Sequence, residues 1–184
     1  MLGSEPAQNP LVKIETKMGS IVVEVDAEHA PLTAANFLRY VDEKRYSGGR
    51  FHRTVTLDNQ PDKKVKIEVI QAGVNPKFEK QDFPPIVLER TSVTGIHHLD
   101  GTISMARDGA DTATSDFFIC IGNQPELDFG GKRNPDGQGF AAFGRVKKGM
   151  EIVRKIQKSH ANEQSLQPPI EILSITRYSE RVRT

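Results

Sequence analysis

The stretch Gly-Thr-Ile-Ser-Met-Ala-Arg from Gly101, followed by Thr-Ser-Asp-Phe-Phe-Ile-Cys-Ile-Gly ending at Gly122, decides the fold class of this chain. It contains two short apolar runs, residues 102–105 and 117–121, which have the length and the β-branched or aromatic content of strands. Most apolar runs between residues 51 and 143 are equally short and are separated by Gly, Pro, Asn or Asp. Many short strands with turn signals between them are typical of an all-β barrel or sandwich.

Regular elements are also expected on both sides of this central part. The remaining apolar or β-branched runs predict strands at residues 11–16, 21–25, 65–70, 140–143 and 170–175. Pro31 suits the first turn of a helix, and Phe37, Leu38 and Val41 follow it at helical spacing. A second helix fits residues 150–157. We therefore expect a loose tail over residues 1–10 and a single mainly β domain over residues 11–184.

The composition argues against several classes of partner. The 184 residues carry a formal net charge of +1, so no nucleic-acid partner is expected. No run approaches the ~20 apolar residues that span a membrane, so no membrane partner is expected either. Residues 1–10 lack the apolar stretch of a signal peptide. A cytoplasmic location and a mature exported, periplasmic form both stay open.

Cysteine and histidine point to no metal or nucleophile. Cys120 is the single cysteine and lies in an apolar run, so we interpret it as a small core residue. His97 and His98 are adjacent, and on a strand their side chains would point apart, with no ligand set at metal spacing beside them.

Five segments, taken in order, carry a resemblance to a known family. They are Phe51-His52-Arg53, Ile70-Gln71-Ala72-Gly73, residues 101–106, residues 115–118 and Phe143-Gly144-Arg145-Val146. Together they resemble the cyclophilins, the peptidyl-prolyl cis-trans isomerases, and residues 125–144 look like bacterial members. The resemblance implies a mainly β fold, a closed antiparallel eight-stranded β-barrel capped by two α-helices. Periodicity alone leaves a sandwich equally open.

The resemblance also implies the site residues. Arg53 would be catalytic, because a guanidinium can donate a hydrogen bond to the prolyl nitrogen when the amide is twisted. Gln71 would orient Arg53, Ala106 and Arg107 would present backbone groups to the residues before the proline, and no cofactor or metal is needed. The full set expected to contact substrate is Phe51, Val69, Gln71, Ala106, Arg107, Asp116, Phe118, Leu127 and Phe140.

One strand is expected to divide its faces between core and site. Phe117 and Phe118 are neighbours, so their side chains face opposite sides of the strand. We place Phe117 in the sealed core and Phe118 on the floor of the proline pocket, partly exposed to solvent.

The sequence departs from the best-known family pattern at several positions. Residues 56–64 form a long polar stretch where many members turn tightly, and Glu68 stands where a phenylalanine is common. Asp116 replaces a common glutamine, and Phe140 stands where a histidine is often found. Glu126 replaces an aromatic residue that many eukaryotic members use to bind cyclosporin, so weak binding of cyclosporin-like ligands is expected.

The expected partners are proline-containing segments of unfolded or partly folded polypeptides, bound by a monomer. One alternative is a proline-peptide binding module or holdase chaperone without catalysis. The presence of Arg53 argues against it, since binding alone needs only the pocket. A scaffold domain of a larger assembly is a third interpretation.

Overall fold

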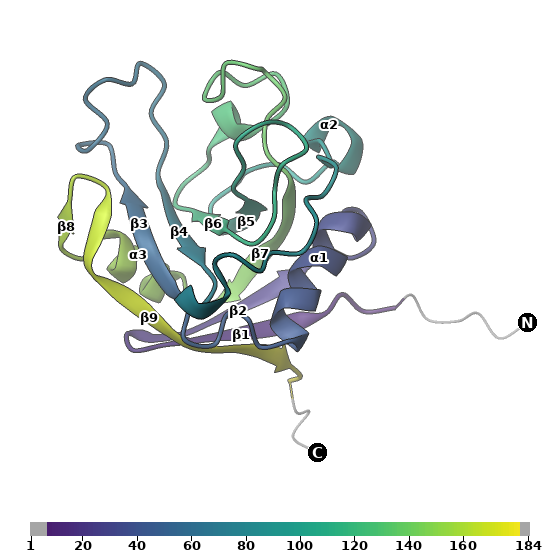
Figure 1. Cartoon of the computed structure of the whole chain (residues 1–184). Helices are drawn as coiled ribbons and strands as arrows, with labels where there is room; N and C mark the ends of the chain where they lie inside the picture. Colours follow the sequence, from purple (N-terminus) through teal and green to yellow (C-terminus); the bar gives the residue numbers. More distant parts are fainter. Residues whose placement is uncertain (1–6, 181–184) are drawn as a thin grey trace, which may run out of the picture.

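The computed structural model describes residues 7–180, in which an antiparallel sheet closes on itself (Figure 1). Its neighbours run in the order β1-β2-β7-β5-β6-β4-β3-β9, and β9 pairs back onto β1. This ring confirms the predicted closed eight-stranded barrel, and a short β8 forms a hairpin with β9 outside it. The strands are β1 (Leu11–Thr16), β2 (Gly19–Val25), β3 (Arg50–Val55), β4 (Val69–Gly73), β5 (Thr102–Met105), β6 (Phe117–Cys120), β7 (Ala142–Lys148), β8 (Ala161–Asn162) and β9 (Ser165–Tyr178).

Both predicted helices are present, on opposite sides of the barrel in Figure 1. They are α1 (Pro31–Asp42), which has Pro31 in its first turn, and α3 (Met150–Gln157). A third helix, α2 (Thr91–Thr94), has only four residues, which is too short for a helical period to show in the sequence. Two single 3-10 turns, η1 (Pro76–Phe78) and η2 (Pro125–Leu127), lie in the connecting loops.

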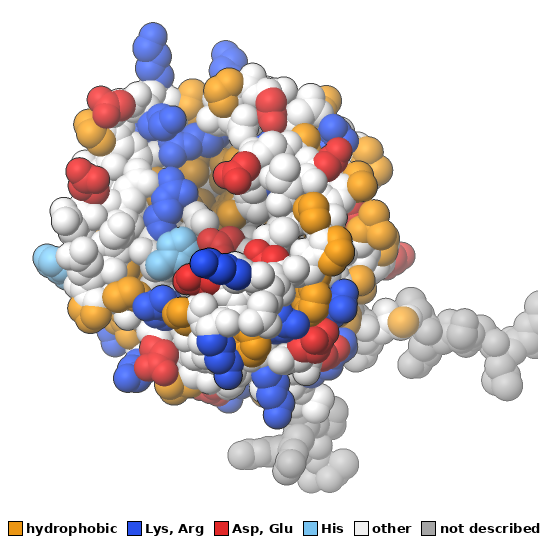
Figure 2. Space-filling model, in the orientation of Figure 1, with side chains coloured by type: hydrophobic (Ala, Val, Ile, Leu, Met, Phe, Trp, Pro, Cys, Tyr) orange, Lys and Arg blue, Asp and Glu red, His pale blue; other side chains and the backbone are white. Residues whose placement is uncertain are grey.

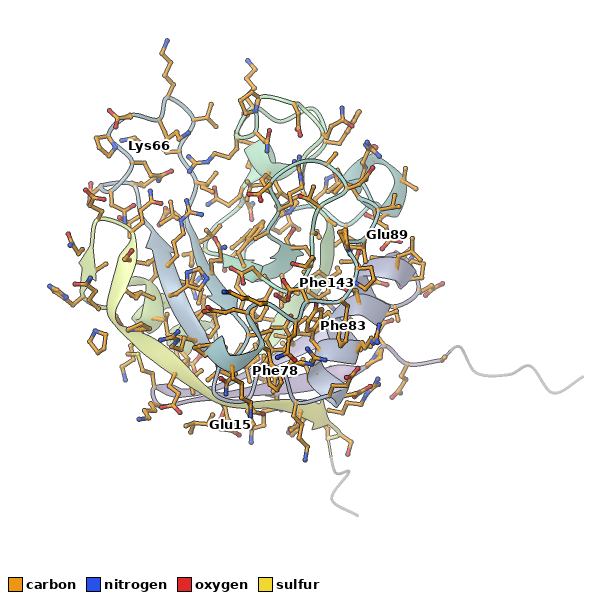
Figure 3. All side chains as sticks on the ribbon, viewed as in Figure 1. Glu15, Lys66, Phe78, Phe83, Glu89 and Phe143 are labelled. Atoms are coloured by element: carbon orange, nitrogen blue, oxygen red, sulfur yellow. The ribbon has the colours of Figure 1, made fainter. Side chains whose placement is uncertain are left out.

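Aromatic side chains dominate the interior of the barrel. Phe37 of α1 lies 5.0 Å from Phe143 and 5.6 Å from Phe117, measured between ring centroids. All three rings are fully buried, and Figure 3 shows Phe143 inside the fold. Because edge-to-face and tilted pairs add to the free energy of burial, α1 is fixed against the sheet.

A second, smaller apolar cluster lies on the other side of β6. Its buried members are Val55, Ile67, Val69, Phe118, Cys120 and Leu127, with Ala106 and Phe140 packed against it. The interpretation of Cys120 as a small core residue is confirmed, since its side chain is fully buried and free of any disulfide. Burial raises the pKa of this thiol well above its ordinary value.

Two predicted strands begin later than expected, because side chains and loops take the hydrogen bonds of their first residues. Residues 65–68 are not part of β4, since the Gln60 side chain accepts from the Ile67 N–H at 3.2 Å and donates to the Ile67 carbonyl at 2.8 Å. Phe140 is not part of β7, because its N–H donates to the Leu127 carbonyl at 3.0 Å.

The predicted N-terminal tail is described only in part. Residues 1–6 of the predicted tail lie outside the described residues, and residues 7–10 form no helix or strand. None of the helices between residues 7 and 180 has the length and apolar character needed to cross a membrane.

Candidate active site

A cavity of about 260 Å³ opens above β4 and β6, and we call it the Arg53 cavity. It brings together eight of the ten residues predicted for the site, and the two that do not line it are Phe51 and Asp116. Its lining consists of Arg53, Ile67, Val69, Gln71, Ala106, Arg107, Asp108, Phe118, Leu127, Arg133 and Phe140.

Arg53 is held at the edge of this cavity by two amide side chains. Its Nε donates to Gln164 Oε1 at 2.9 Å, and its Nη1 donates to Gln71 Oε1 at 3.0 Å. Within residues 7–180 its Nη2 has no hydrogen-bond partner. Burial lowers the pKa of Arg53 from its ordinary value, and a guanidinium still stays protonated near neutral pH. The side chain therefore offers a fixed donor with one nitrogen left for a ligand.

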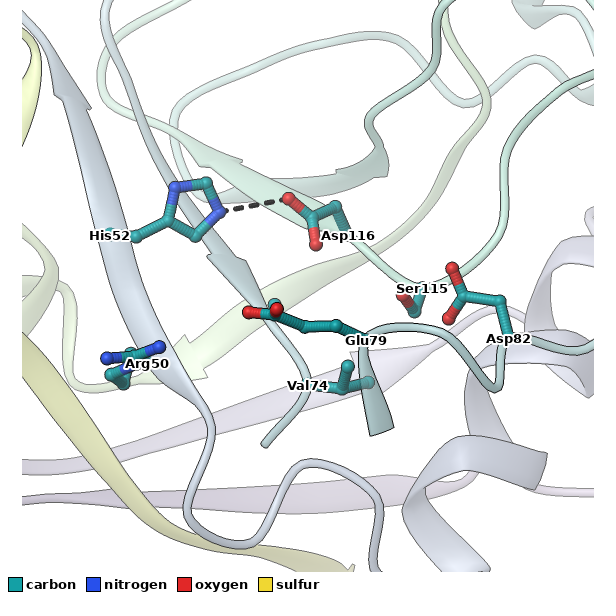
Figure 4. Close-up of a pocket in the computed structure, with 8 residues that line it drawn as sticks. Arg50, His52, Val74, Glu79, Asp82, Ser115 and Asp116 are labelled. Atoms are coloured by element: carbon teal, nitrogen blue, oxygen red, sulfur yellow. Dashed lines mark hydrogen bonds and ion pairs between the residues drawn. The ribbon is translucent and has the colours of Figure 1, made fainter. Parts of the chain in front are cut away.

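Gln71 is itself fixed by Asp116. The Gln71 Nε2 donates to Asp116 Oδ2 at 3.0 Å, and His52 Nε2 lies 2.9 Å from the same oxygen. Since a carboxylate only accepts, it forces the NH₂ of Gln71 toward itself and the amide oxygen toward Arg53. Asp116 does not line the Arg53 cavity. It lines a neighbouring cavity of about 280 Å³ together with His52, shown in Figure 4.

The apolar part of the site consists of two phenylalanines and two aliphatic residues. Phe118 and Phe140 pack edge to face with centroids 5.6 Å apart, and Val69 and Leu127 belong to the same cluster. Phe118 is 5% exposed, so the predicted partial exposure of this ring is wrong. The Arg107 guanidinium lies 4.8 Å from the centroid of Phe140 and closes that side.

Backbone groups at the rim are free to pair with a peptide. The Ala106 N–H donates to the Asp116 carbonyl at 3.0 Å. Within residues 7–180 the Ala106 carbonyl and the Arg107 N–H have no hydrogen-bond partner. Because β5 ends at Met105, these groups continue its edge beyond the last sheet pairing.

Phe51 is a predicted site residue that does not line the Arg53 cavity. Its ring is fully buried and meets Phe117 edge to face, with centroids 6.1 Å apart. On β3 it alternates with His52, so it faces the interior of the barrel while His52 faces out.

Three lining residues were not predicted. Ile67 supplies the wall for which Glu68 offered no apolar side chain, and its spacing of two from Val69 is a strand-like signal. Glu68 instead accepts from Gln157 Nε2 at 2.8 Å. Asp108 and Arg133 come from loops, and no periodicity in the sequence marks them.

The two adjacent histidines do not point apart, which corrects the sequence-based expectation. His98 Nδ1 lies 2.7 Å from Asp128 Oδ1, and His97 Nδ1 lies 3.2 Å from Asp128 Oδ2. The residues are not in a strand, so the alternation argument does not apply. His98 Nε2 also lies 2.9 Å from the fully buried Ser104 Oγ, and the His98 ring stacks on Phe118. Within residues 7–180 no three His, Cys, Asp or Glu side chains are placed to hold a metal ion.

The chain belongs to the cyclophilin-type peptidyl-prolyl cis-trans isomerases, since the model of the family "Cyclophilin type peptidyl-prolyl cis-trans isomerase/CLD" matches residues 11–177. It is 35% identical over 150 residues to peptidyl-prolyl cis-trans isomerase A of Dickeya dadantii, covering 80% of this chain and 70% of that protein. It is 33% identical over 181 residues to a peptidyl-prolyl cis-trans isomerase of Acinetobacter baylyi, covering 95% of this chain and 89% of that protein.

Solved structures show the same fold. A cyclophilin-type isomerase of Cryptosporidium parvum matches with a TM-score of 0.75 at 20% identity, covering 94% of this chain and 99% of that one. A second structure of that protein, in the presence of the dipeptide Ala-Pro, matches with a TM-score of 0.73 at 20% identity and covers 92% and 99% of the two chains.

Proposed function

We propose that this isomerase binds a proline ring in the Arg53 cavity and uses Arg53 to stabilise the twisted X-Pro amide. The observation that carries the proposal is the guanidinium held by Gln164 and Gln71 at the edge of a cavity with an apolar floor. Within residues 7–180 its Nη2 has no hydrogen-bond partner. Phe118, Val69, Leu127 and Phe140 receive the ring, and the free backbone groups of residues 106 and 107 pair with the peptide before it.

The reaction explains why a donor without a nucleophile suffices. Rotation about the peptide bond has a barrier of roughly 18–20 kcal/mol from amide resonance. In the twisted state the prolyl nitrogen regains a lone pair, so a hydrogen bond from Arg53 is strong there and weak to either planar form. Stabilisation by about 7 kcal/mol of the twisted state alone would accelerate exchange by five decades.

The substrates proposed are proline-containing segments of unfolded or partly folded polypeptides, bound by a monomer. An extended segment can reach both the cavity and the free backbone edge, whereas a proline inside a packed domain cannot. The Ala-Pro dipeptide in the Cryptosporidium parvum structure supports a proline-containing ligand for this fold.

Exchange spectroscopy by NMR on a blocked X-Pro peptide tests the proposal directly. Uncatalysed cis–trans exchange takes tens to hundreds of seconds. We expect catalytic amounts of the protein to raise the exchange rate by several powers of ten. Saturable peptide binding without faster exchange would identify a binding module or holdase instead, and would contradict the proposed function.

A further inference from the structure

A second arginine, Arg133, lines the Arg53 cavity. Arg133 reaches the cavity from the loop after η2. Within residues 7–180 no carboxylate oxygen lies within 4.0 Å of the guanidinium of Arg53 or Arg133. The third arginine of the cavity differs, because Arg107 donates to both oxygens of Asp136 at 2.9 and 3.0 Å.

The long polar loop between β3 and β4 holds Arg133 in place. The Arg133 Nη1 donates to Gln60 Oε1 at 2.7 Å and to the Val65 carbonyl at 2.8 Å. Gln60 is only 2% exposed, and its Nε2 donates to the carbonyls of Thr56 and Ile67. The loop that departs from the family pattern therefore fixes the position of this guanidinium through Nη1. Its Nε and Nη2 have no hydrogen-bond partner within residues 7–180.

The loop adds no other cation to the cavity lining. Lys66, labelled on this loop in Figure 3, does not line the cavity, because its Nζ donates to the Leu57 carbonyl across the loop at 3.1 Å. Figure 2 shows basic side chains gathered along a hollow on this face of the molecule.

Neighbouring acids do not neutralise the two guanidinium groups at short range. Asp108 lines the cavity beside Arg107, outside ion-pair distance of Arg53 and Arg133. Asp58, Asp62 and Glu163 line a separate hollow on the other side of Arg53. Burial and the charge of Arg53 both lower the pKa of Arg133, so each cation is less well solvated than in water. An anion entering the cavity would meet two cations with unused donors.

We propose that Arg133 determines specificity by selecting peptides with Asp or Glu immediately after the proline. This inference rests on the proposed function, which places the proline ring over Phe118 and its nitrogen at Arg53. The chain before the proline is assigned to the backbone edge at Ala106 and Arg107. The residue after the proline then lies toward the β3–β4 loop, where Gln60 holds Arg133.

Catalysed exchange in a matched peptide series tests the preference. The series is Ac-Ala-Pro-Yaa-Ala-NH₂ with Glu, Gln or Lys at Yaa, together with Ac-Glu-Pro-Ala-Ala-NH₂, followed by NMR without a coupling protease. For the wild type we expect kcat/KM for the Glu peptide to exceed that for the Gln peptide about tenfold at low salt, with the Lys peptide below both. Since screening weakens exposed charge pairs, the Glu-to-Gln ratio should fall as salt is added.

Two variants that each remove one positive charge distinguish an effect of Arg133 in the cavity from an effect of the protein's overall charge. Arg133→Gln should bring the Glu-to-Gln ratio close to one. Arg145→Gln removes the same charge from β7, where the side chain is 63% exposed, and should keep the ratio. The salt series on the wild type decides the matter even if Arg133→Gln does not fold.

Failure of this inference differs from failure of the proposed function. If the Gln peptide is isomerised but the wild-type ratio is near one, or Arg133→Gln keeps the ratio, Arg133 is not the selector. A preference for the acid before the proline would overturn the assignment of position. If no peptide exchanges faster, the proposed function fails, and calorimetric affinities of the same peptides then decide the charge preference.

Discussion

Two adjacent phenylalanines on β6 have entirely different surroundings. Phe117 is fully buried inside the barrel and meets Phe37, Tyr46 and Phe51 edge to face, with centroids 5.3 to 6.1 Å apart. Phe118 is 5% exposed and meets one aromatic edge, Phe140, and one stacked imidazole, His98. One strand thus separates a sealed core from the Arg53 cavity.

Different interactions stabilise the two faces of β6, which we call the core face, with Phe117, and the cavity face, with Phe118. Packing of aromatic and aliphatic side chains dominates the core face. Polar side chains fix the cavity face, with Asp116 orienting Gln71 and Arg53 on one side, and Asp128 holding His98 under Phe118 on the other. The core face should therefore govern stability, and the cavity face should govern activity and respond to pH.

Replacing each phenylalanine with alanine should give the largest difference between the core face and the cavity face. Phe117→Ala should lower the free energy of unfolding by about 3–5 kcal/mol, because it leaves a sealed void among packed rings. Phe118→Ala should cost less, since its removal enlarges a cavity that already opens to solvent, but should slow isomerisation strongly. Denaturant midpoints and exchange rates of both variants provide the measurement.

The opposite result would show that we have assigned the two faces of β6 the wrong way round. If Phe118→Ala unfolded the protein while Phe117→Ala stayed stable and inactive, the cavity floor would be the ring that we place in the core.

Removing the Arg53 donor tests the cavity face without disturbing the core. Arg53→Ala should reduce kcat/KM by at least about 100-fold, because a charge-assisted bond to the twisted nitrogen contributes about 3 kcal/mol. Arg53→Lys should recover little, since an ammonium lacks the rigid planar fork that places separate nitrogens toward Gln164, Gln71 and the ligand. Peptide exchange by NMR measures both, with circular dichroism as the control for folding. Near-normal turnover in two folded variants would refute the mechanism.

The parts of the fold that the sequence predicts are those set by local patterns. Strands at residues 11–16 and 102–105 and the helix at 150–157 follow from short-range periodicity, and the structure has them with the same bounds. The alternation on β6 placed Phe117 and Phe118 on opposite faces. Motif resemblance, and not periodicity, selected a closed barrel over a sandwich.

What the sequence could not predict depends on side chains from distant loops. Gln60 takes the hydrogen bonds of Ile67 and so shortens β4. Arg133 reaches the cavity because that same Gln60 holds it, 73 residues away in sequence. Asp128 draws both His97 and His98 to one carboxylate, against the alternation expected of a strand.

Lowering the pH should destabilise the packing of the cavity face before that of the core face. Burial opposes ionisation of Asp128, but hydrogen bonds from His98 and His97 outweigh it and hold its pKa below the ordinary value of 3.8. The folded state therefore binds this proton less readily than the unfolded state. The resulting stability is present above about pH 4 and is lost as pH falls through the folded-state pKa.

Asp128→Asn isolates this contribution. It should lower the free energy of unfolding at neutral pH by about 2 kcal/mol, the cost of losing hydrogen bonds to a charged acceptor. It should also flatten the acid limb of stability against pH, and reduce activity through Phe118. Urea unfolding between pH 3 and 7 is the measurement, and an acid limb identical to that of the wild type would show that Asp128 is not the group responsible.

The smallest expected effect concerns a ligand at the rim of the cavity face. Glu126 Oε2 accepts from the Lys132 N–H at 2.7 Å, and the side chain does not line the Arg53 cavity. An apolar cyclic peptide such as cyclosporin would have to cover this carboxylate without pairing it, which is unfavourable. We expect weak binding by the wild type and roughly fivefold or greater tightening in Glu126→Trp, because an indole there would bury apolar surface against the ligand. Calorimetric titration of both proteins measures the change, and Glu126→Gln, which removes the charge but adds no apolar surface, should account for only part of it. Equal affinities in all three proteins would place the ligand-binding rim elsewhere on the cavity face.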